Sequence, residues 1–223
     1  NIKGTHNFVA GYDNDVYKEM DHGTKTLSTI AMNQPTVFVG TAPKADFWLL
    51  RTEDYSTESP AEEDFWIAAV EFSDSVGVDI ISSSLGYHGF DDKTMNYRYS
   101  DLNGRTAAIS QAASRLASKG MILVNSAGND GMGTWKKINV PADAHDILTV
   151  GAVSLDKVNA PFSSIGPTAD GRIKPDVMAY GCPTNVVSGR GYIIPDNGTS
   201  FACPLIAGMV ACLWQACPNK SAK

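Results

Sequence analysis

The sequence predicts an α/β fold built on a parallel sheet. Short apolar runs alternate with segments of helical periodicity along the 223 residues, and polar loops follow the apolar runs. Alternating strands and helices are typical of parallel strands joined by right-handed crossovers. Because the chain shows no internal repeat, low-complexity tract or linker, we expect one domain over residues 1–223.

The first half of the chain contains a helical run and two predicted strands. Small residues over 24–31 favour a helix, and the apolar run 45–51 (ADFWLLR) is typical of a strand. A second strand is expected at 78–82. A loop rich in Tyr, Asp and Asn then runs to about residue 103.

The helix between these strands has a clear start. Ser59 is the expected N-cap, Pro60 takes the first helical position, and Glu62 completes a capping box. Gly77 is expected to end the helix. Apolar residues at spacings of four, three and four predict its buried face, which consists of Phe65, Ala69, Phe72 and Val76.

The second half continues the alternation. A helix is expected over about 105–118, with Gly120 as its C-cap, and strands are expected at 121–124 and 147–153. A last, apolar helix begins near Ser200. In a parallel sheet, functional residues gather in the loops that leave the carboxyl ends of the strands.

The composition is that of an ordinary globular protein and excludes some partners. Hydrophobic residues make up 43% of the chain and charged residues 19%, with a formal net charge of -6. A nucleic-acid partner needs a basic face, which this chain lacks. No apolar stretch approaches the ~20 residues of a membrane span. The chain begins at Asn1 with neither an initiator Met nor a signal peptide, so we expect a removed leader or an excerpt.

The cysteines are expected to be small buried hydrophobes. Three of the four crowd into one apolar segment, which does not resemble a spaced disulfide framework, although a disulfide stays open as an alternative. A zinc site is not expected, because no CxxC pair occurs. The four are Cys182, Cys203, Cys212 and Cys217.

The segment 197–204 (NGTSFACP) places Ser200 at the start of the apolar helix. Backbone N–H groups and the helix dipole then face whatever this serine attacks. Pro204 fits because the first helical turn needs no intrahelical N–H donor at that position. The alternative is that Ser200 is only an N-capping residue.

Two further segments carry candidate chemistry. His22 opens the helical run at 24–31 and is followed by Gly23, a position suited to an exposed, rigidly held base. Asn129 lies in a tight Gly turn after the strand at 121–124, where its amide can donate to an oxyanion. The alternative for Asn129 is a simple Asn-Asp-Gly turn.

These segments form an ordered set with several others. The set comprises His22-Gly23-Thr24, Gly40-Thr41-Ala42-Pro43, Ser84-Leu85-Gly86, Ala127-Gly128-Asn129, Val150-Gly151-Ala152-Val153, Phe162-Ser163-Ser164 and Gly198-Thr199-Ser200. In this order it resembles the subtilisin-like (subtilase) serine endopeptidases from about Phe8 to Pro218. The resemblance implies a three-layer α/β fold, with a mostly parallel central sheet and helices on both faces.

The resemblance also implies roles for single residues. Ser200 is the expected nucleophile, His22 its base, and Asn129 the oxyanion donor. Ser84-Leu85-Gly86 is expected to pair with an extended polypeptide substrate. Ser126-Ala127-Gly128 forms a wall of the pocket for the residue before the cut, and Thr199 contacts substrate. Because the wall residues are small, a roomy, apolar pocket is expected.

No cofactor is expected, and structural calcium stays open as an alternative. Relatives often bind structural calcium, but the loop over 32–38 is short and offers no carboxylate. A secreted or periplasmic location follows only from the habit of the family.

The triad carboxylate of the family has no counterpart in this sequence. It stands at the end of an early strand, several tens of residues before the histidine, whereas only 21 residues precede His22. Asp13, Asp15 and Asp21 are expected to be solvated. We therefore expect a domain that is incomplete at both ends, nearly inactive alone, whose missing N-terminal segment is a possible partner. The alternative is a non-catalytic, subtilase-like peptide-binding or structural module.

Overall fold

The computed structural model describes residues 1–9, 11 and 13–223. Helices and strands lie at the predicted segments, and further strands that were not predicted occur at 2–7, 33–34, 38–39, 177–182, 184–187 and 193–196. The helices are α1 (His22–Ala31), α2 (Ala61–Ser75), α3 (Ala108–Ala113) and α4 (Thr199–Ala216). The strands are β1 (Ile2–Asn7), β2 (Asn33–Gln34), β3 (Phe38–Val39), β4 (Phe47–Arg51), β5 (Ile80–Ser83), β6 (Ile122–Ser126), β7 (Leu148–Ser154), β8 (Val177–Cys182), β9 (Thr184–Val187) and β10 (Ile193–Asp196).

Parallel strands form the centre of the molecule, but in two separate sheets. One sheet has the order β5-β6-β7-β8, and every pair in it is parallel. The other contains only β1 and β4, also parallel. The remaining strands form two antiparallel hairpins, β2-β3 and β9-β10. The predicted parallel α/β fold is confirmed, whereas the division of the sheet was not predicted.

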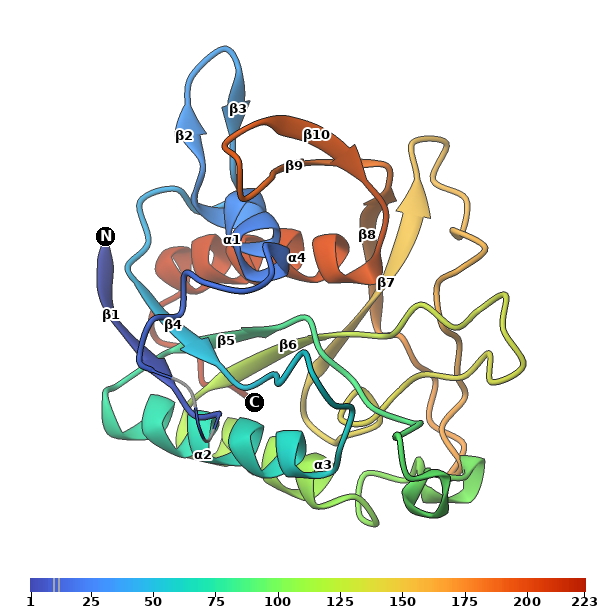
Figure 1. Cartoon of the computed structure of the whole chain (residues 1–223). Helices are drawn as coiled ribbons and strands as arrows, with labels where there is room; N and C mark the ends of the chain where they lie inside the picture. Colours follow the sequence, from blue (N-terminus) through green and yellow to red (C-terminus); the bar gives the residue numbers. More distant parts are fainter. Residues whose placement is uncertain (10, 12) are drawn as a thin grey trace.

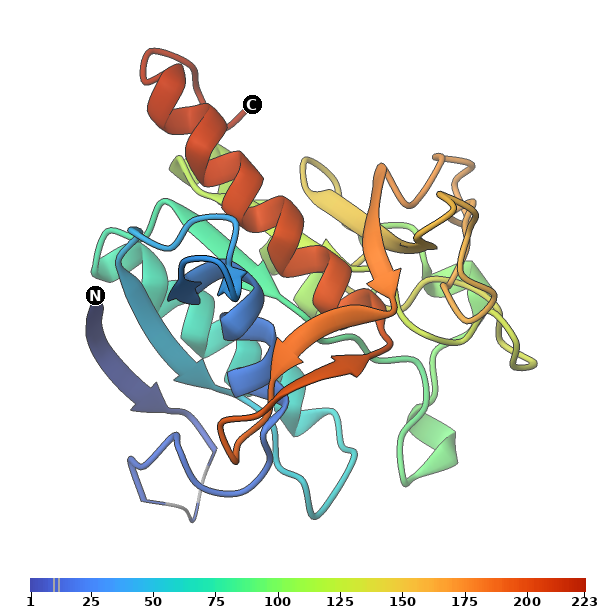
Figure 2. The same ribbon diagram turned by 90° about the horizontal axis from the view of Figure 1, so that it is seen from above.

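Helices cover both faces of the sheets. In Figure 1, α1 and α4 lie above the central strands, and α2 and α3 lie below them. Figure 2 shows α4 lying over the sheet, with its axis roughly along the direction of β4. Helix α4 is apolar and long enough to cross a membrane by length and composition alone. Its first half is buried against the sheet, so packing accounts for that composition.

The core has one part on each face of the larger sheet. On the α2 and α3 face it is centred on Leu123, Ile109 and Val140, none of which is exposed. On the α4 face, Val124 and Val150 pack against Ala202 of the helix. Successive residues of a buried strand point to opposite faces, which explains why neighbouring residues of β6 belong to different parts of the core.

Helix α2 differs from its prediction in the face that it buries. Glu62 accepts a hydrogen bond from the Ser59 backbone N–H at 3.1 Å, as half of the predicted capping box. The helix begins at Ala61, however, so Pro60 rather than Ser59 is the N-cap residue. Of the predicted face only Ala69 is buried, and Trp66 lies beside it. Phe72 instead packs edge-on against Trp48, with the ring centroids 5.3 Å apart. Because Phe72 packs against the β1-β4 sheet, the buried face of α2 differs from the face that the spacing of apolar residues predicts.

Two other predictions need correction. The helix expected over 105–118 is divided into α3 and a 3-10 turn over Leu116–Lys119, although Gly120 ends the turn in the predicted left-handed conformation. All four cysteines are free thiols. Of these only Cys203 is buried, whereas Cys212 and Cys217 are exposed because α4 extends beyond the sheet.

Leu123→Ala tests the core on the α2 and α3 face. The side chain is fully buried in β6, so its truncation leaves a cavity and should lower the free energy of unfolding by about 2–5 kcal/mol. Urea denaturation followed by circular dichroism measures the loss. Leu155→Ala is the matched control, since Leu155 is 67% exposed. Equal midpoints for the two variants would contradict this description of the core.

Candidate active site

The predicted site residues lie where strands end and helices begin. Ser84 directly follows β5, and Asn129 lies three residues after β6. His22 is the first residue of α1 and Ser200 the second residue of α4. Parallel strands deliver their carboxyl ends to one edge of the sheet, so β5 and β6 bring their two loops to the start of α4.

Ser200 is held against the end of β5. The Ser84 hydroxyl donates to the Ser200 carbonyl at 2.8 Å, and the Ser200 hydroxyl donates in return to the Ser84 carbonyl at 3.5 Å. The latter distance is long for an O–H···O bond, so little holds the hydroxyl in place. Ser200 is 8% exposed, and its hydroxyl forms no hydrogen bond with His22 within the described part of the chain.

Asn129 is oriented by the start of α4. Its Oδ1 accepts from the Thr199 backbone N–H at 2.9 Å and from the Thr199 hydroxyl at 3.0 Å. Because a backbone N–H can only donate, the oxygen of the amide must face Thr199. The Nδ2 group therefore points away from the helix, and Asn129 as a whole is exposed. This contact explains why Thr199, although it is fully buried, belongs with the site.

The loop that carries Asn129 is rigidly built. Gly128 has φ +107°, and a Cβ there would lie 2.9 Å from Asn139 Nδ2 and from the Ser164 hydroxyl. Asn139 donates to Asp130 at 2.9 Å, and the Ser164 hydroxyl accepts from the Asp130 backbone N–H at 3.0 Å. Sequence reasoning missed Asn139 and Ser164, because 10 and 35 residues separate them from Asn129 and only the fold brings them together.

His22 is half-buried, and the nearby carboxylates of Asp21 and Asp196 act on it only through their charges. Burial is the main cause that lowers the pKa of its imidazole, and the Lys25 charge adds to this effect. The Asp21 carboxylate is engaged elsewhere: it accepts from the Gly189 backbone N–H at 3.0 Å and pairs with Lys25. Lys25 also pairs with Asp196 at 3.0 Å. Among the described residues, no side-chain oxygen accepts a hydrogen bond from the His22 ring.

The predicted substrate strand and pocket wall are neighbours. Asn125 donates its side-chain amide to the Leu85 carbonyl at 3.2 Å, which ties the segment after β5 to β6. Gly86 lies close to Asn139, since a Cβ at residue 86 would be 3.0 Å from its Cβ. Of the wall residues, Ser126 and Ala127 are buried, whereas Gly128 is partly exposed.

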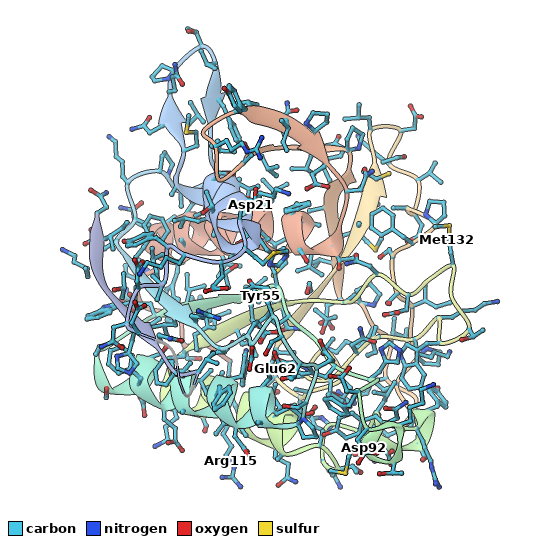
Figure 3. The ribbon with its side chains drawn as sticks, in the orientation of Figure 1. Asp21, Tyr55, Glu62, Asp92, Arg115 and Met132 are labelled. Carbon is cyan, nitrogen blue, oxygen red and sulfur yellow. The ribbon has the colours of Figure 1, made fainter. Side chains whose placement is uncertain are left out.

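A cavity of about 1570 Å³ opens beside His22, between β4 and β5. Ser84, Leu85 and Glu53 also border it. Burial raises the pKa of Glu53 to about 7, and the Tyr87 hydroxyl donates to its carboxylate. In Figure 3, Asp21 at the start of α1 and Glu62 at the start of α2 lie above and below this region, with Tyr55 between them.

The other three histidines lie outside the candidate site, and the residues described do not form a metal site. His6 stacks on Phe72, His88 stacks on Trp135, and His145 lies 4.0 Å from Asp170. Within the residues that the structure describes, no three His, Cys, Asp or Glu side chains gather as metal ligands. The loop over 32–38, considered above for calcium, forms the β2-β3 hairpin.

Comparison with known proteins gives one consistent result. The subtilase family model, Peptidase_S8, matches residues 4–223. Subtilisin NAT of Bacillus subtilis subsp. natto is 30% identical over 221 residues, which cover 98% of this chain and 52% of that protein. Subtilisin DY of Bacillus licheniformis is 29% identical, over 99% of this chain and 73% of that protein. The chain thus spans about half the length of some of the curated relatives that it matches.

Solved structures agree on the fold. A cold-adapted subtilisin-like serine proteinase superposes with a TM-score of 0.73 at 20% identity, over 96% of this chain and 68% of that chain. The prenylagaramide maturation protease PagA gives a TM-score of 0.68 at 25% identity, over 87% of this chain and 64% of that chain.

The lowered pKa of His22 predicts how the site responds to pH. In NMR titration, the His22 ring protons should report a pKa below the ordinary 6.5, and His22→Gln should remove this resonance while the other histidine resonances remain. The unfolded chain then binds more protons than the folded chain near and below pH 6.5. Stability should therefore fall as the pH is lowered through this window, and the fall should be smaller in His22→Gln. A His22 midpoint at or above 6.5 would disprove the burial argument.

Proposed function

The chain belongs to the subtilase family, and on that premise we propose that it carries the catalytic apparatus of a serine endopeptidase. The observation that supports this most directly is the amide of Asn129. Thr199 fixes its oxygen, so its N–H donors face outward beside the segment that begins with Ser200. An amide held in this orientation is suited to stabilise the oxyanion of a tetrahedral intermediate.

The proposed reaction uses three side chains. The Ser200 hydroxyl attacks the carbonyl carbon of the peptide, and His22 accepts its proton. The carbonyl oxygen becomes an oxyanion that receives hydrogen bonds from Asn129 Nδ2 and from the Ser200 backbone N–H. His22 then returns the proton to the leaving amine, and water hydrolyses the acyl-enzyme by the same sequence of steps. The loosely held Ser200 hydroxyl has to turn towards His22 for the first step.

The substrate of this proposal is an extended polypeptide. It adds a strand along Ser84-Leu85-Gly86, while Ser126-Ala127-Gly128 borders the pocket for the residue before the cut. Because these three bordering residues are small and uncharged, the substrate residue before the cut is expected to be apolar. A secreted or periplasmic location belongs to the same proposal and rests on the habit of the family.

The residues of this chain support slow catalysis only. No carboxylate among the described residues orients the His22 ring, and Asp21 is engaged by Gly189 and Lys25. In the well-characterised serine-protease triads, loss of the carboxylate alone lowers kcat on the order of 10⁴-fold. The alternative, a non-catalytic peptide-binding module, has no use for an oriented oxyanion donor, so the amide of Asn129 favours the enzyme.

Ser200→Ala tests the nucleophile. A fluorophosphonate probe should label the chain slowly, and the substitution should abolish that labelling because it removes the proposed nucleophile. Ser118→Ala, which changes an exposed serine at the end of a 3-10 turn, should label at the unaltered rate. In-gel fluorescence with mass spectrometry of the labelled peptide measures both. Labelling of Ser200→Ala at the same site and rate would refute the proposal.

Asn129→Ala tests the oxyanion donor. Loss of one such donor should lower kcat for hydrolysis of an activated p-nitrophenyl ester by about 10²–10³-fold relative to the unsubstituted chain. The KM should change little, since the donor acts on the transition state. Asn219→Ala, at an exposed position near the C-terminus, is the control. An unchanged kcat in Asn129→Ala would favour the non-catalytic alternative.

A further inference from the structure

The hairpin β9-β10 leads directly into the helix that carries Ser200. Strand β10 ends at Asp196, and only Asn197 and Gly198 separate it from α4. The Gly198 backbone N–H donates to the Gly181 carbonyl at 2.9 Å, which ties this short connection to β8. Because so few residues lie between the hairpin and the helix, the position of the hairpin constrains the first turn of α4.

The same hairpin is attached to helix α1, whose first residue is His22. The Ser28 hydroxyl accepts a hydrogen bond from the Val187 backbone N–H at 2.9 Å. The Asp21 carboxylate accepts one from the Gly189 backbone N–H at 3.0 Å. The hairpin and α1 accordingly lie side by side in Figures 1 and 2. The hairpin thus connects the helix of the base to the helix of the nucleophile.

Lys25 adds an ionic connection between α1 and the hairpin. Its Nζ lies 3.4 Å from Asp21 Oδ1 and 3.0 Å from Asp196 Oδ2. A backbone donor orients each carboxylate, Gly189 for Asp21 and Asn197 for Asp196. These contacts raise the pKa of Lys25, the hydrogen bond with Asp196 most of all. Since the Lys25 side chain is only 20% exposed, solvent screens this network less than it screens a surface ion pair.

The three residues of this network also supply the charges that act on His22. Burial is the largest cause of the lowered pKa of His22. The Lys25 charge lowers this pKa further, whereas the charges of Asp196 and Asp21 raise it. Helix α4 contributes the uncharged ring of Phe201, whose centroid lies 6.3 Å from that of the imidazole. A carboxylate without a cationic partner would favour protonation of the imidazole, so Lys25 offsets both carboxylates.

We propose that Lys25 is a positioning residue for His22. Its ammonium group holds α1 against the hairpin that leads to Ser200, and it engages the carboxylates of Asp21 and Asp196 so that neither pairs with the imidazole. This role rests on the proposed function, in which His22 accepts the Ser200 proton. A base has to be unprotonated to accept that proton, which is the state that the network favours.

NMR titration of the His22 ring protons tests this role without relying on catalysis. In Lys25→Met the pKa of His22 should rise, because Asp21 and Asp196 lose the cation that offsets them. In Asp196→Asn the pKa of His22 should fall, because one carboxylate is lost while Lys25 keeps its charge. Lys25→Arg should keep the value of the unsubstituted chain, since it restores the cation. Both Lys25→Met and Asp196→Asn break the same ion pair, so a merely structural role would not give opposite shifts.

Lys18→Met is the matched control for the titration. Lys18 also pairs with two carboxylates, those of Asp13 and Asp15, but its charge does not act on His22. This variant should leave the pKa of His22 unchanged. Circular dichroism melting shows which variants are folded, and Asp196→Asn decides the question if Lys25→Met is not. Equal pKa values of His22 in Lys25→Met and Lys18→Met would overturn the proposal, as would shifts of the same sign in Lys25→Met and Asp196→Asn.

Labelling of Ser200 by a fluorophosphonate at a series of pH values separates this proposal from the catalytic one. The midpoint of the labelling profile should move to higher pH in Lys25→Met and to lower pH in Asp196→Asn, in parallel with the pKa of His22. A midpoint that stays unmoved while the pKa shifts would overturn the positioning role. Absence of labelling together with the expected NMR shifts would refute the catalytic proposal alone and support the pairing of Lys25 with both carboxylates.

Discussion

The contact between Thr199 and Asn129 is the interaction on which the candidate site depends. It joins the first turn of the buried helix α4 to the loop after β6, and it uses a backbone N–H that the helix itself leaves unsatisfied. The helix thus gains a partner for that donor, and the amide gains a fixed orientation. Without this contact, Asn129 would be an exposed turn residue, and nothing would determine which of Oδ1 and Nδ2 faces Thr199.

The rest of the site extends from this contact. The Ser84 hydroxyl fixes the Ser200 carbonyl on the side of β5, and Asn139 and Ser164 fix the Asn129 loop on the side of β6. Only the base is set apart from this network. His22 is the first residue of α1, which is not part of the larger sheet. Among the described residues, the His22 ring forms a hydrogen bond neither with Ser200 nor with a carboxylate.

The isolation of His22 and the divided sheet share one location. The cavity that lies between β4 and β5 also borders His22. On its other side the His22 ring lies 6.3 Å, between ring centroids, from Phe201 of α4.

The sequence by itself determined the four helical segments, the strands β4 to β7, the parallel α/β fold, and the positions of Ser200 and Asn129 at a helix start and after a strand. Local signals specify these features: apolar runs, the Glu62 carboxylate at the start of α2, and glycines where the backbone turns. The tertiary structure alone decided the buried face of α2, where Trp48 and Phe72 pack, and the exposure of Cys212 and Cys217. It also decided the orientation of the Asn129 amide and the split between β4 and β5. These features depend on contacts between residues far apart in the chain, and no local pattern in the sequence records them.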